Sequence, residues 1–180
     1  MSAAEPLTGV FPIAPTTFNE DGSLDLDSQR RALECMVDQG VDGICILANY
    51  SEQFVLSDAE RETLLDVCAE HIAGRVALIV TTSHYSTDIA AARASRAAAA
   101  GADMLMIMPP YHGALLKADE ARIFEHYARI ADSVDIPLMV QDAPLSGVDL
   151  SVPFLGRMAR EISQVDYLKV EMPGTAAKLR

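Results

Sequence analysis

Short apolar runs recur along this chain at intervals of about 30 residues, the length of one strand-plus-helix unit. They occupy residues 9–15, 43–49, 76–82, 104–110, 136–142 and 167–171. The runs are apolar almost throughout and do not alternate with polar residues, as expected for parallel strands that helices cover on both faces. The pattern therefore predicts an α/β protein.

The segments between these runs carry helix start and stop signals. Ser57 and Glu60 have the spacing of a capping box, which predicts a helix running to Gly74, and an alanine-rich helix is expected from about Asp88 to Gly101. No glycine-rich phosphate loop follows the first run, where a dinucleotide-binding fold would carry one. A (β/α)8 TIM barrel is favoured over a doubly wound sheet.

The chain is shorter than a complete barrel of this kind. A complete barrel usually needs about 250 residues, whereas this chain has 180 and contains about six strand-plus-helix units. We therefore expect residues 1–180 to form a single barrel domain that is truncated at its C-terminal end. If the natural protein ended at Arg180, the exposed sheet edge would favour a different class of function, a non-catalytic fragment acting as an assembly module.

Charge and segment composition limit the partners and the location. Asp and Glu outnumber Lys and Arg by 26 to 14, giving a formal net charge of −12, so the long-range field repels nucleic acid and anionic membrane surfaces. The N-terminus has no signal-peptide pattern, and no apolar run reaches the roughly 18 residues that a membrane span needs. We expect a cytoplasmic protein with neither nucleic-acid nor membrane partners.

The cysteines and histidines suggest neither disulfides nor a metal. Cys35, Cys45 and Cys68 are widely spaced in apolar surroundings, which predicts buried thiols in a reducing compartment. The histidines form no metal-ligand pattern with one another or with the cysteines. No metal site is expected.

Polar residues at the ends of the apolar runs are the candidates for a site, because a barrel carries its active site at the carboxyl ends of its strands. The candidates are Asn49, Tyr50, Ser51, Tyr111, Gln141, Lys169 and Glu171. Lys169 and Glu171 are two residues apart, so on a strand they share one face. Asp142, directly after Gln141, is expected to point the other way and is left out of the catalytic set.

Lys169 is the residue that most needs an explanation, since it interrupts an apolar strand in a chain with only three lysines. In a low-dielectric interior the neutral amine is favoured and can attack a ketone to form a Schiff base. Glu171 would then move protons at the carbon beside the imine. A structural ion pair between Lys169 and Glu171 is the alternative, and the spacing alone leaves both open.

Segments 9–65, 101–112, 136–151 and 167–174 together resemble the dihydrodipicolinate synthase and N-acetylneuraminate lyase family, Schiff-base aldolases and dehydratases built as (β/α)8 barrels. The resemblance implies that Lys169 is the Schiff-base lysine and that Asn49 and Tyr50 replace a pair that holds the keto-acid carboxylate. Tyr111 falls on the second tyrosine of a loop that in the synthases reaches a neighbouring subunit's site. A small 2-keto acid substrate, no cofactor beyond the covalent lysine imine, and a homo-oligomer, commonly a tetramer, are also implied.

Departures from the family pattern point to one branch. Gln141 stands where the aldolases have a catalytic tyrosine, and an amide cannot shuttle a proton. Asn49 replaces a threonine hydroxyl of the same proton relay. The order "KVE" at residues 169–171 replaces the common "KEA". These features resemble the sugar-acid dehydratase branch, which implies a hydro-lyase converting 2-keto-3-deoxy-L-arabonate to 2,5-dioxopentanoate.

Two further expectations complete this interpretation. Ser146 is a turn residue first and a candidate for hydrogen bonds to substrate oxygens. A pyruvate-dependent aldolase or synthase, or a hydroxyproline-pathway deaminase of the same family, is the alternative activity.

Overall fold

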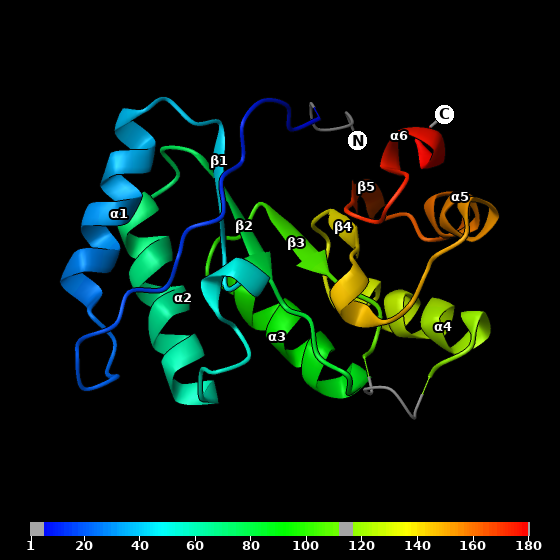
Figure 1. Cartoon of the computed structure of the whole chain (residues 1–180), viewed down its shortest axis with the longest axis horizontal. Coiled ribbons are helices and arrows are strands. Elements are labelled where there is room, and N and C mark those ends of the chain that lie inside the picture. Colours follow the sequence, from blue (N-terminus) through cyan, green and yellow to red (C-terminus); the bar gives the residue numbers. More distant parts are fainter. Residues whose placement is uncertain (1–5, 112–116, 180) are drawn as a thin grey trace. The chain divides into compact units, whose positions relative to one another are not determined.

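The computed structural model describes residues 6–111 and 117–179. The chain divides into two compact units, and Figure 1 labels the helices and strands of each. The first comprises Met1–Thr81 with Ala100–Asp103, and the second Thr82–Ala99 with Met104–Arg180. The expectation of a single barrel domain over residues 1–180 stays a prediction.

The first unit contains two parallel strands and the helices beside them. Its elements are α1 (Leu26–Asp38), β1 (Gly43–Ile46), the 3-10 helix η1 (Asn49–Ser51), α2 (Asp58–Ile72) and β2 (Ala77–Thr81). In the register of β1 with β2, Gly43 lies opposite Ala77 and Ile46 opposite Val80. Helices α1 and α2 pack against each other, and every residue of β1 is buried.

Helix α2 begins as the sequence predicts. The Ser57 side chain accepts from the Glu60 amide while the Glu60 carboxylate accepts from the Ser57 amide, which completes the capping box. The helix ends at Ile72, two residues before the predicted end at Gly74, because Ala73 already adopts a left-handed conformation. The alanine-rich helix is likewise confirmed, over Thr87–Ala99.

The first apolar run, residues 9–15, was predicted as a strand but forms only an isolated parallel bridge between Ile13 and Cys45. The Ala14 amide donates to the Cys45 carbonyl and the Cys45 amide to the Pro12 carbonyl, both at 2.9 Å. Pro12 and Pro15 have no N–H to donate, so a regular ladder cannot extend through the run.

The second unit contains three strands and four α-helices among its described residues. Its elements are α3 (Thr87–Ala99), β3 (Met104–Ile107), α4 (Glu120–Ala131), β4 (Leu138–Asp142), the 3-10 helix η2 (Pro144–Ser146), α5 (Val152–Glu161), β5 (Val165–Val170) and α6 (Thr175–Lys178). Strand β4 pairs in parallel with both β3 and β5. Helices α3 and α4 pack together, and α5 packs against β5.

The core of the second unit lies along β3, where Met104 to Met108 are all at most 1% exposed. Tyr127 of α4 is fully buried there, and its hydroxyl donates to the Ile107 carbonyl at 2.8 Å. Burial, with a smaller contribution from the negative charge of Asp142, raises the pKa of Tyr127 well above its usual value. The predicted α/β architecture with parallel strands is confirmed in both units, and β1 to β4 are buried almost throughout, whereas only Val165 is buried in β5.

One burial prediction was wrong. Cys45 and Cys68 are buried, but Cys35 is exposed. Helix α1 turns Leu33 inward, and Cys35, two positions later, is about 200° further round the helix and faces solvent. No helix among residues 6–111 and 117–179 is both long and apolar enough to cross a bilayer.

Candidate active site

Lys169 lies near the carboxyl end of β5, directly opposite Gln141 of β4. Its Nζ is 3.1 Å from Oε1 of Glu171, and each of the two side chains is 29% exposed. The two side chains therefore share one face of the strand, as their spacing predicts. An amine and a carboxylate in contact, partly shielded from water, can serve as a nucleophile with a neighbouring base.

Gln141 holds the second oxygen of the same carboxylate. Its Nε2 donates to Oε2 of Glu171 at 2.8 Å, and the residue is 2% exposed. Glu171 is thus fixed between Lys169 and Gln141. The Gln141 Oε1 atom is buried without a hydrogen-bond partner in the described part of the chain, so its capacity to accept a hydrogen bond is unused there.

A register shift places these residues opposite one another. Leu138 pairs with Val165 but Met139 pairs with Tyr167, so β5 carries one extra residue at this point. Such bulges redirect the side chains that follow. Uninterrupted pairing would place Lys169 opposite Asp142 instead of Gln141. The sequence contains no signal from which we could predict this shift.

Tyr111 belongs to an aromatic group of the second unit. Its ring meets the Tyr85 ring edge-to-face, with centroids 6.3 Å apart, and Tyr85 in turn stacks on His84 at 4.2 Å. Tyr111 is half-buried and Tyr85 is 54% exposed. The catalytic role of Tyr111 stays a prediction.

Ser146 lies in η2, after β4, and its side chain bonds the local backbone. The hydroxyl is 2.9 Å from the Ala143 carbonyl, and it accepts from the Val148 amide at 3.2 Å. This is the turn role that the sequence predicts. Binding of substrate by Ser146 stays a prediction.

Asn49, Tyr50 and Ser51 form η1, directly after β1 in the first unit. Asn49 Oδ1 accepts from Gln53 Nε2 at 2.7 Å. Tyr50 is 76% exposed, whereas Ser51 is buried. The three residues predicted to bind substrate are thus adjacent but differ in access to solvent.

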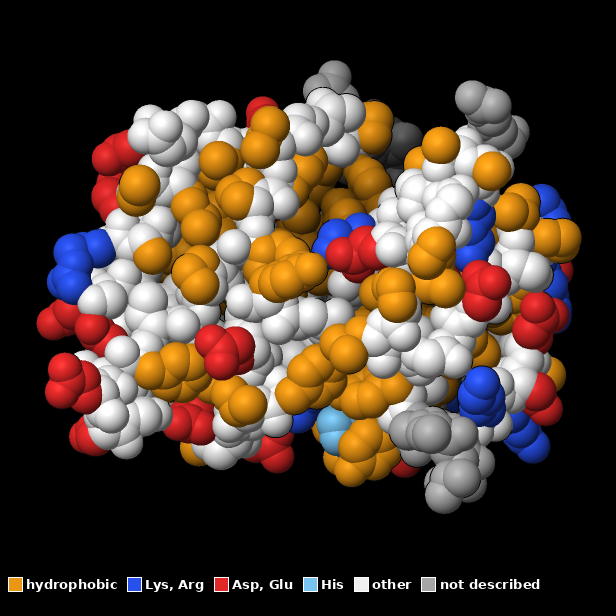
Figure 2. All heavy atoms as spheres, in the orientation of Figure 1, with side chains coloured by type: hydrophobic (Ala, Val, Ile, Leu, Met, Phe, Trp, Pro, Cys, Tyr) orange, Lys and Arg blue, Asp and Glu red, His pale blue; other side chains and the backbone are white. Residues whose placement is uncertain are grey.

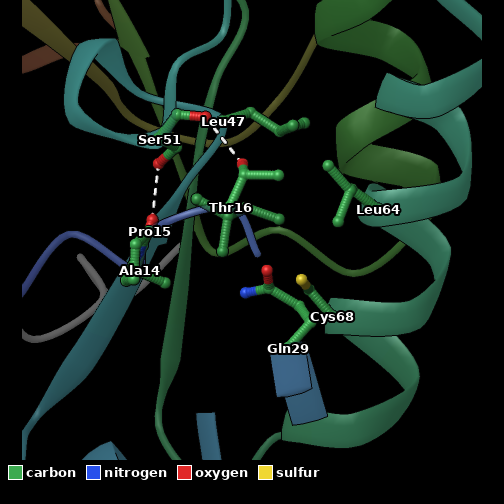
Figure 3. Close-up of a pocket in the computed structure, with 9 residues that line it drawn as sticks. Ala14, Pro15, Thr16, Gln29, Leu47, Ser51, Leu64 and Cys68 are labelled. Carbon is green, nitrogen blue, oxygen red and sulfur yellow. Dashed lines mark hydrogen bonds between the residues drawn. The ribbon is translucent and has the colours of Figure 1, made fainter. Parts of the chain in front are cut away.

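Hydrogen bonds to backbone carbonyls hold the η1 segment. The Ser51 hydroxyl donates to the Ala14 carbonyl, and the Thr16 hydroxyl to the Ser51 carbonyl, both at 2.6 Å (Figure 3). Leu47 and Glu52, on either side of η1, have φ angles of 55° and 57°, in the left-handed region. Such conformations persist in non-glycine residues where the surrounding structure enforces them.

A small pocket lies beside η1 within the first unit, and Ser51, Thr16, Gln29 and Cys68 contribute its polar or sulfur-bearing lining (Figure 3). Burial, opposed only weakly by the charge of Arg30, raises the pKa of the Cys68 thiol to about 12. The thiol is therefore protonated and unreactive at neutral pH.

No group of three or more His, Cys, Asp or Glu side chains is arranged to hold a metal ion in residues 6–111 and 117–179. On the face shown in Figure 2, the Lys and Arg side chains lie in small separate groups among acidic and apolar ones.

Comparison with known proteins identifies the family. The model of the dihydrodipicolinate synthetase family matches residues 6–173. This chain belongs to that family. Within it, the chain is 61% identical over 172 residues to the L-2-keto-3-deoxyarabonate dehydratase of Azospirillum brasilense, covering 96% of this chain and 56% of the relative.

More distant members of the family match over a similar part of their length. The chain is 31% identical over 164 residues to the 4-hydroxy-tetrahydrodipicolinate synthase of Bartonella bacilliformis, covering 91% of this chain and 55% of the relative. It spans about half the length of the curated relatives it matches.

Solved structures of the family confirm the predicted fold class. YagE, a prophage protein from E. coli K12 solved in complex with pyruvate, superposes with a TM-score of 0.88 at 28% identity, covering 94% of this chain and 56% of YagE. The dihydrodipicolinate synthase of Aquifex aeolicus gives 0.87 at 27% identity, covering 93% and 56%. The fold is that of a (β/α)8 barrel, of which this chain contains part.

Proposed function

We propose that the protein is a Schiff-base hydro-lyase that dehydrates a 2-keto-3-deoxy sugar acid, 2-keto-3-deoxy-L-arabonate, to 2,5-dioxopentanoate. The single observation that carries this proposal is the carboxylate of Glu171, held between Lys169 Nζ at 3.1 Å and Gln141 Nε2 at 2.8 Å. The 61% identity to the Azospirillum dehydratase supports the substrate.

Imine formation is the first step of the proposed reaction. The Lys169 amine attacks the C2 ketone, and water leaves as the iminium forms. The iminium withdraws electrons from C3, so the Glu171 carboxylate can take a C3 proton to give the enamine. The imine itself is the electron sink, and the reaction requires no metal ion or further cofactor.

Elimination and hydrolysis complete the reaction. The enamine expels the C4 hydroxyl, which leaves as water after gaining a proton, and a conjugated iminium remains. Loss of a C5 proton and gain of a proton at C3 leave an enol across C4 and C5, which becomes the C5 aldehyde when C4 gains a proton and the enol hydroxyl loses one. Water then hydrolyses the imine, releasing 2,5-dioxopentanoate and free Lys169.

Gln141 is the reason to favour dehydration over aldol chemistry. A tyrosine hydroxyl can relay a proton to and from a substrate, but a carboxamide cannot. The Gln141 amide can orient Glu171 through Nε2, and its buried Oε1 can accept a hydrogen bond from a substrate hydroxyl. We place Asn49 and Tyr50 at the substrate carboxylate and keep Ser51, Tyr111 and Ser146 as candidate site residues.

Location and assembly belong to the same proposal. We expect a cytoplasmic homo-oligomer, a tetramer or a dimer, whose partner is a small 2-keto acid. The net charge of −12 supports the absence of nucleic-acid and anionic-membrane partners.

Replacing Lys169 tests the proposal. Lys169→Ala is expected to abolish turnover of 2-keto-3-deoxy-L-arabonate, while Lys117→Ala, at an exposed position, leaves it unchanged. Products are followed by mass spectrometry. Full activity in Lys169→Ala would contradict the mechanism. Free pyruvate as product would favour an aldolase, and ammonia released from a hydroxyproline derivative would favour a deaminase.

A further inference from the structure

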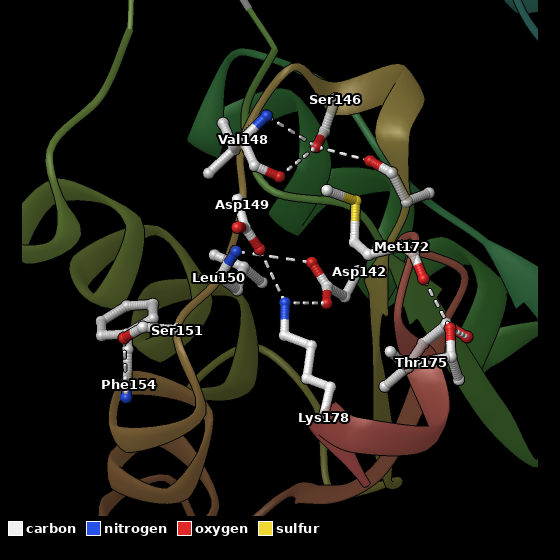
Figure 4. A network of polar contacts seen from close by, with 12 residues as sticks. Asp142, Ser146, Val148, Asp149, Leu150, Ser151, Phe154, Met172, Thr175 and Lys178 are labelled. Carbon is white, nitrogen blue, oxygen red and sulfur yellow. Dashed lines mark hydrogen bonds and ion pairs between the residues drawn. The ribbon is translucent and has the colours of Figure 1, made fainter.

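The short helix α6 is tied to strand β4 by an ion pair that the proposed chemistry does not use. Lys178 Nζ lies 2.6 Å from Asp142 Oδ2 and 2.8 Å from Asp149 Oδ1 (Figure 4). Asp142 is fully buried and the Lys178 side chain is only 12% exposed. Asp149 is 75% exposed at its side chain, so the buried partner of Lys178 is Asp142.

Asp142 contacts the candidate active site through its backbone. It directly follows Gln141 on β4 and pairs with Val170 of β5. Its carbonyl accepts from the Glu171 amide at 2.9 Å, one residue past the end of β5. One residue therefore binds Lys178 through its side chain and fixes Glu171 through its main chain.

The other end of α6 holds the same segment. The Thr175 hydroxyl donates to the Met172 carbonyl at 2.6 Å, and the Thr175 amide donates to the same carbonyl at 3.2 Å (Figure 4). The stretch from Glu171 to Gly174 is thus held by Asp142 on one side and by α6 on the other. Lys178 closes this loop of contacts by joining α6 to Asp142.

Electrostatics favour a persistent contact. Burial of the Lys178 amine opposes its charge, but the carboxylates of Asp142 and Asp149 outweigh that effect and raise its pKa. Without Lys178, Asp142 would be a buried carboxylate facing no cation, which proteins avoid by moving the group or taking up a proton. Either response would disturb the backbone that holds Glu171.

We propose that Lys178 is a positioning residue that acts through Asp142 to hold Glu171 where it can take the C3 proton. This inference rests on the proposed function, because it assigns Glu171 the role of base. Lys169 is in regular pairing within β5, whereas Glu171 lies beyond the last strand residue. Loss of Lys178 therefore affects proton transfer from C3 and leaves imine formation largely intact.

Two of the three lysines of the chain, Lys178 and Lys117, provide matched variants for the test. Lys178→Met removes the charge, Lys178→Arg keeps it, and Lys117→Met is the exposed control. The protein is expressed from its complete coding sequence. The measurements are borohydride trapping of pyruvate on Lys169, deuterium incorporation at C3 of pyruvate, and hydrogen exchange of the Glu171 amide by NMR.

For Lys178→Met we expect C3 deuterium incorporation to slow by roughly tenfold to a hundredfold, the cost of a small displacement of a reacting group. Trapping should stay within about threefold of wild type, and the Glu171 amide should exchange at least about tenfold faster. Lys178→Arg should restore most of the C3 exchange rate, and Lys117→Met should match wild type in all three measurements.

Wild-type C3 exchange and amide exchange in Lys178→Met would overturn the inference. Equal losses of trapping and C3 exchange would also overturn it, since they indicate general damage. If Lys178→Met does not fold, the double variant Asp142→Asn with Lys178→Met removes the buried unpaired charge and is held to the same expectations. If wild type traps neither pyruvate nor 2-keto-3-deoxy-L-arabonate, the proposed function fails, and Glu171 amide exchange alone decides whether Lys178 positions that residue.

Discussion

The two regions that carry the predicted site residues are built from different kinds of hydrogen bond. At the ends of β4 and β5, side chain meets side chain, as Lys169 and Gln141 both contact the carboxylate of Glu171. At η1, side chain meets backbone, as the hydroxyls of Ser51 and Thr16 donate to carbonyls. The contacts at β4 and β5 position reactive side chains, whereas those at η1 hold the backbone of a loop.

This difference divides the predicted site residues into two groups that the sequence alone does not distinguish. All of them are polar residues at the ends of apolar runs, yet the Ser51 hydroxyl is committed to the fold while Gln141 Oε1 has no partner in the described part of the chain. Changes at Glu171 should therefore alter the reaction with little effect on folding. Changes at Ser51 should alter folding more than the reaction.

The largest effect is expected for Glu171→Gln, which keeps the size of the side chain but removes the base. General-base catalysis contributes typically about 10²- to 10⁴-fold, so kcat should fall by that order in steady-state assays. Borohydride trapping on Lys169 should persist. A variant with unchanged kcat would show that the Lys169–Glu171 contact is only a structural ion pair.

The buried thiol of Cys68, in the pocket beside η1, provides a test of whether this region is structural and shielded from solvent. Its thiol keeps its proton up to about pH 12 in the folded protein, but an unfolded thiol ionises near pH 8.5. The unfolded state therefore binds fewer protons above that value, and stability falls as the pH rises. Between about pH 8.5 and about pH 10.5, wild type should lose about 2 kcal/mol more stability than Cys68→Ala in urea unfolding. Parallel pH profiles would mean that the thiol is not buried.

Ser51→Ala should mainly affect stability. Leaving the Ala14 carbonyl without its donor costs about 1 to 2 kcal/mol for a buried group, measured as a lower urea midpoint. Ser163→Ala, at an exposed serine, is the matched control and should be close to neutral. If Ser51→Ala instead abolished turnover with unchanged stability, Ser51 would belong with the reacting groups.

The smallest effect is expected outside these two regions, on the surface between α1 and α2. Glu34 accepts from Arg75 at 2.8 Å and contacts His71 at 2.9 Å. Bonding to Arg75, reinforced by His71, lowers the pKa of Glu34. Its stabilising contribution is present above the unfolded pKa and lost as the pH falls through the folded value. Glu34→Gln should lower the Tm slightly at neutral pH and not at low pH, with the exposed Glu20→Gln as control. An equal shift at both pH values would exclude this electrostatic cause.

The elements of the fold could be predicted because their signals are local. The capping box of Ser57 and Glu60 marks the start of α2, and apolar runs mark the five strands that the described residues contain. The run at 9–15 misled because Pro12 and Pro15 limit how far pairing extends, and Ala14 is the one residue of the run that is buried. A strand prediction therefore has to consider both the hydropathy of a run and whether its residues have backbone N–H groups to donate.

The site could be predicted only where it depends on one strand. The spacing of Lys169 and Glu171 was enough to place them on one face. The bond from Gln141 to Glu171 depends on a register between two strands that a bulge sets, and the Asp142–Lys178 pair depends on where α6 packs. Both are decided by contacts about 30 or more residues apart in sequence, for which a single sequence carries little signal.

Borohydride trapping with 2-keto-3-deoxy-L-arabonate, followed by peptide mass mapping, tests the assignment of Lys169 most directly. Within residues 1–180 the lysines are Lys117, Lys169 and Lys178, so peptide mapping distinguishes an adduct on Lys169 from one on either of the other two. We predict a reduced adduct on the peptide carrying Lys169 and none on the other two. A folded protein that gives no adduct with this acid or with pyruvate, or one that is modified only at Lys117 or Lys178, would contradict the proposed chemistry.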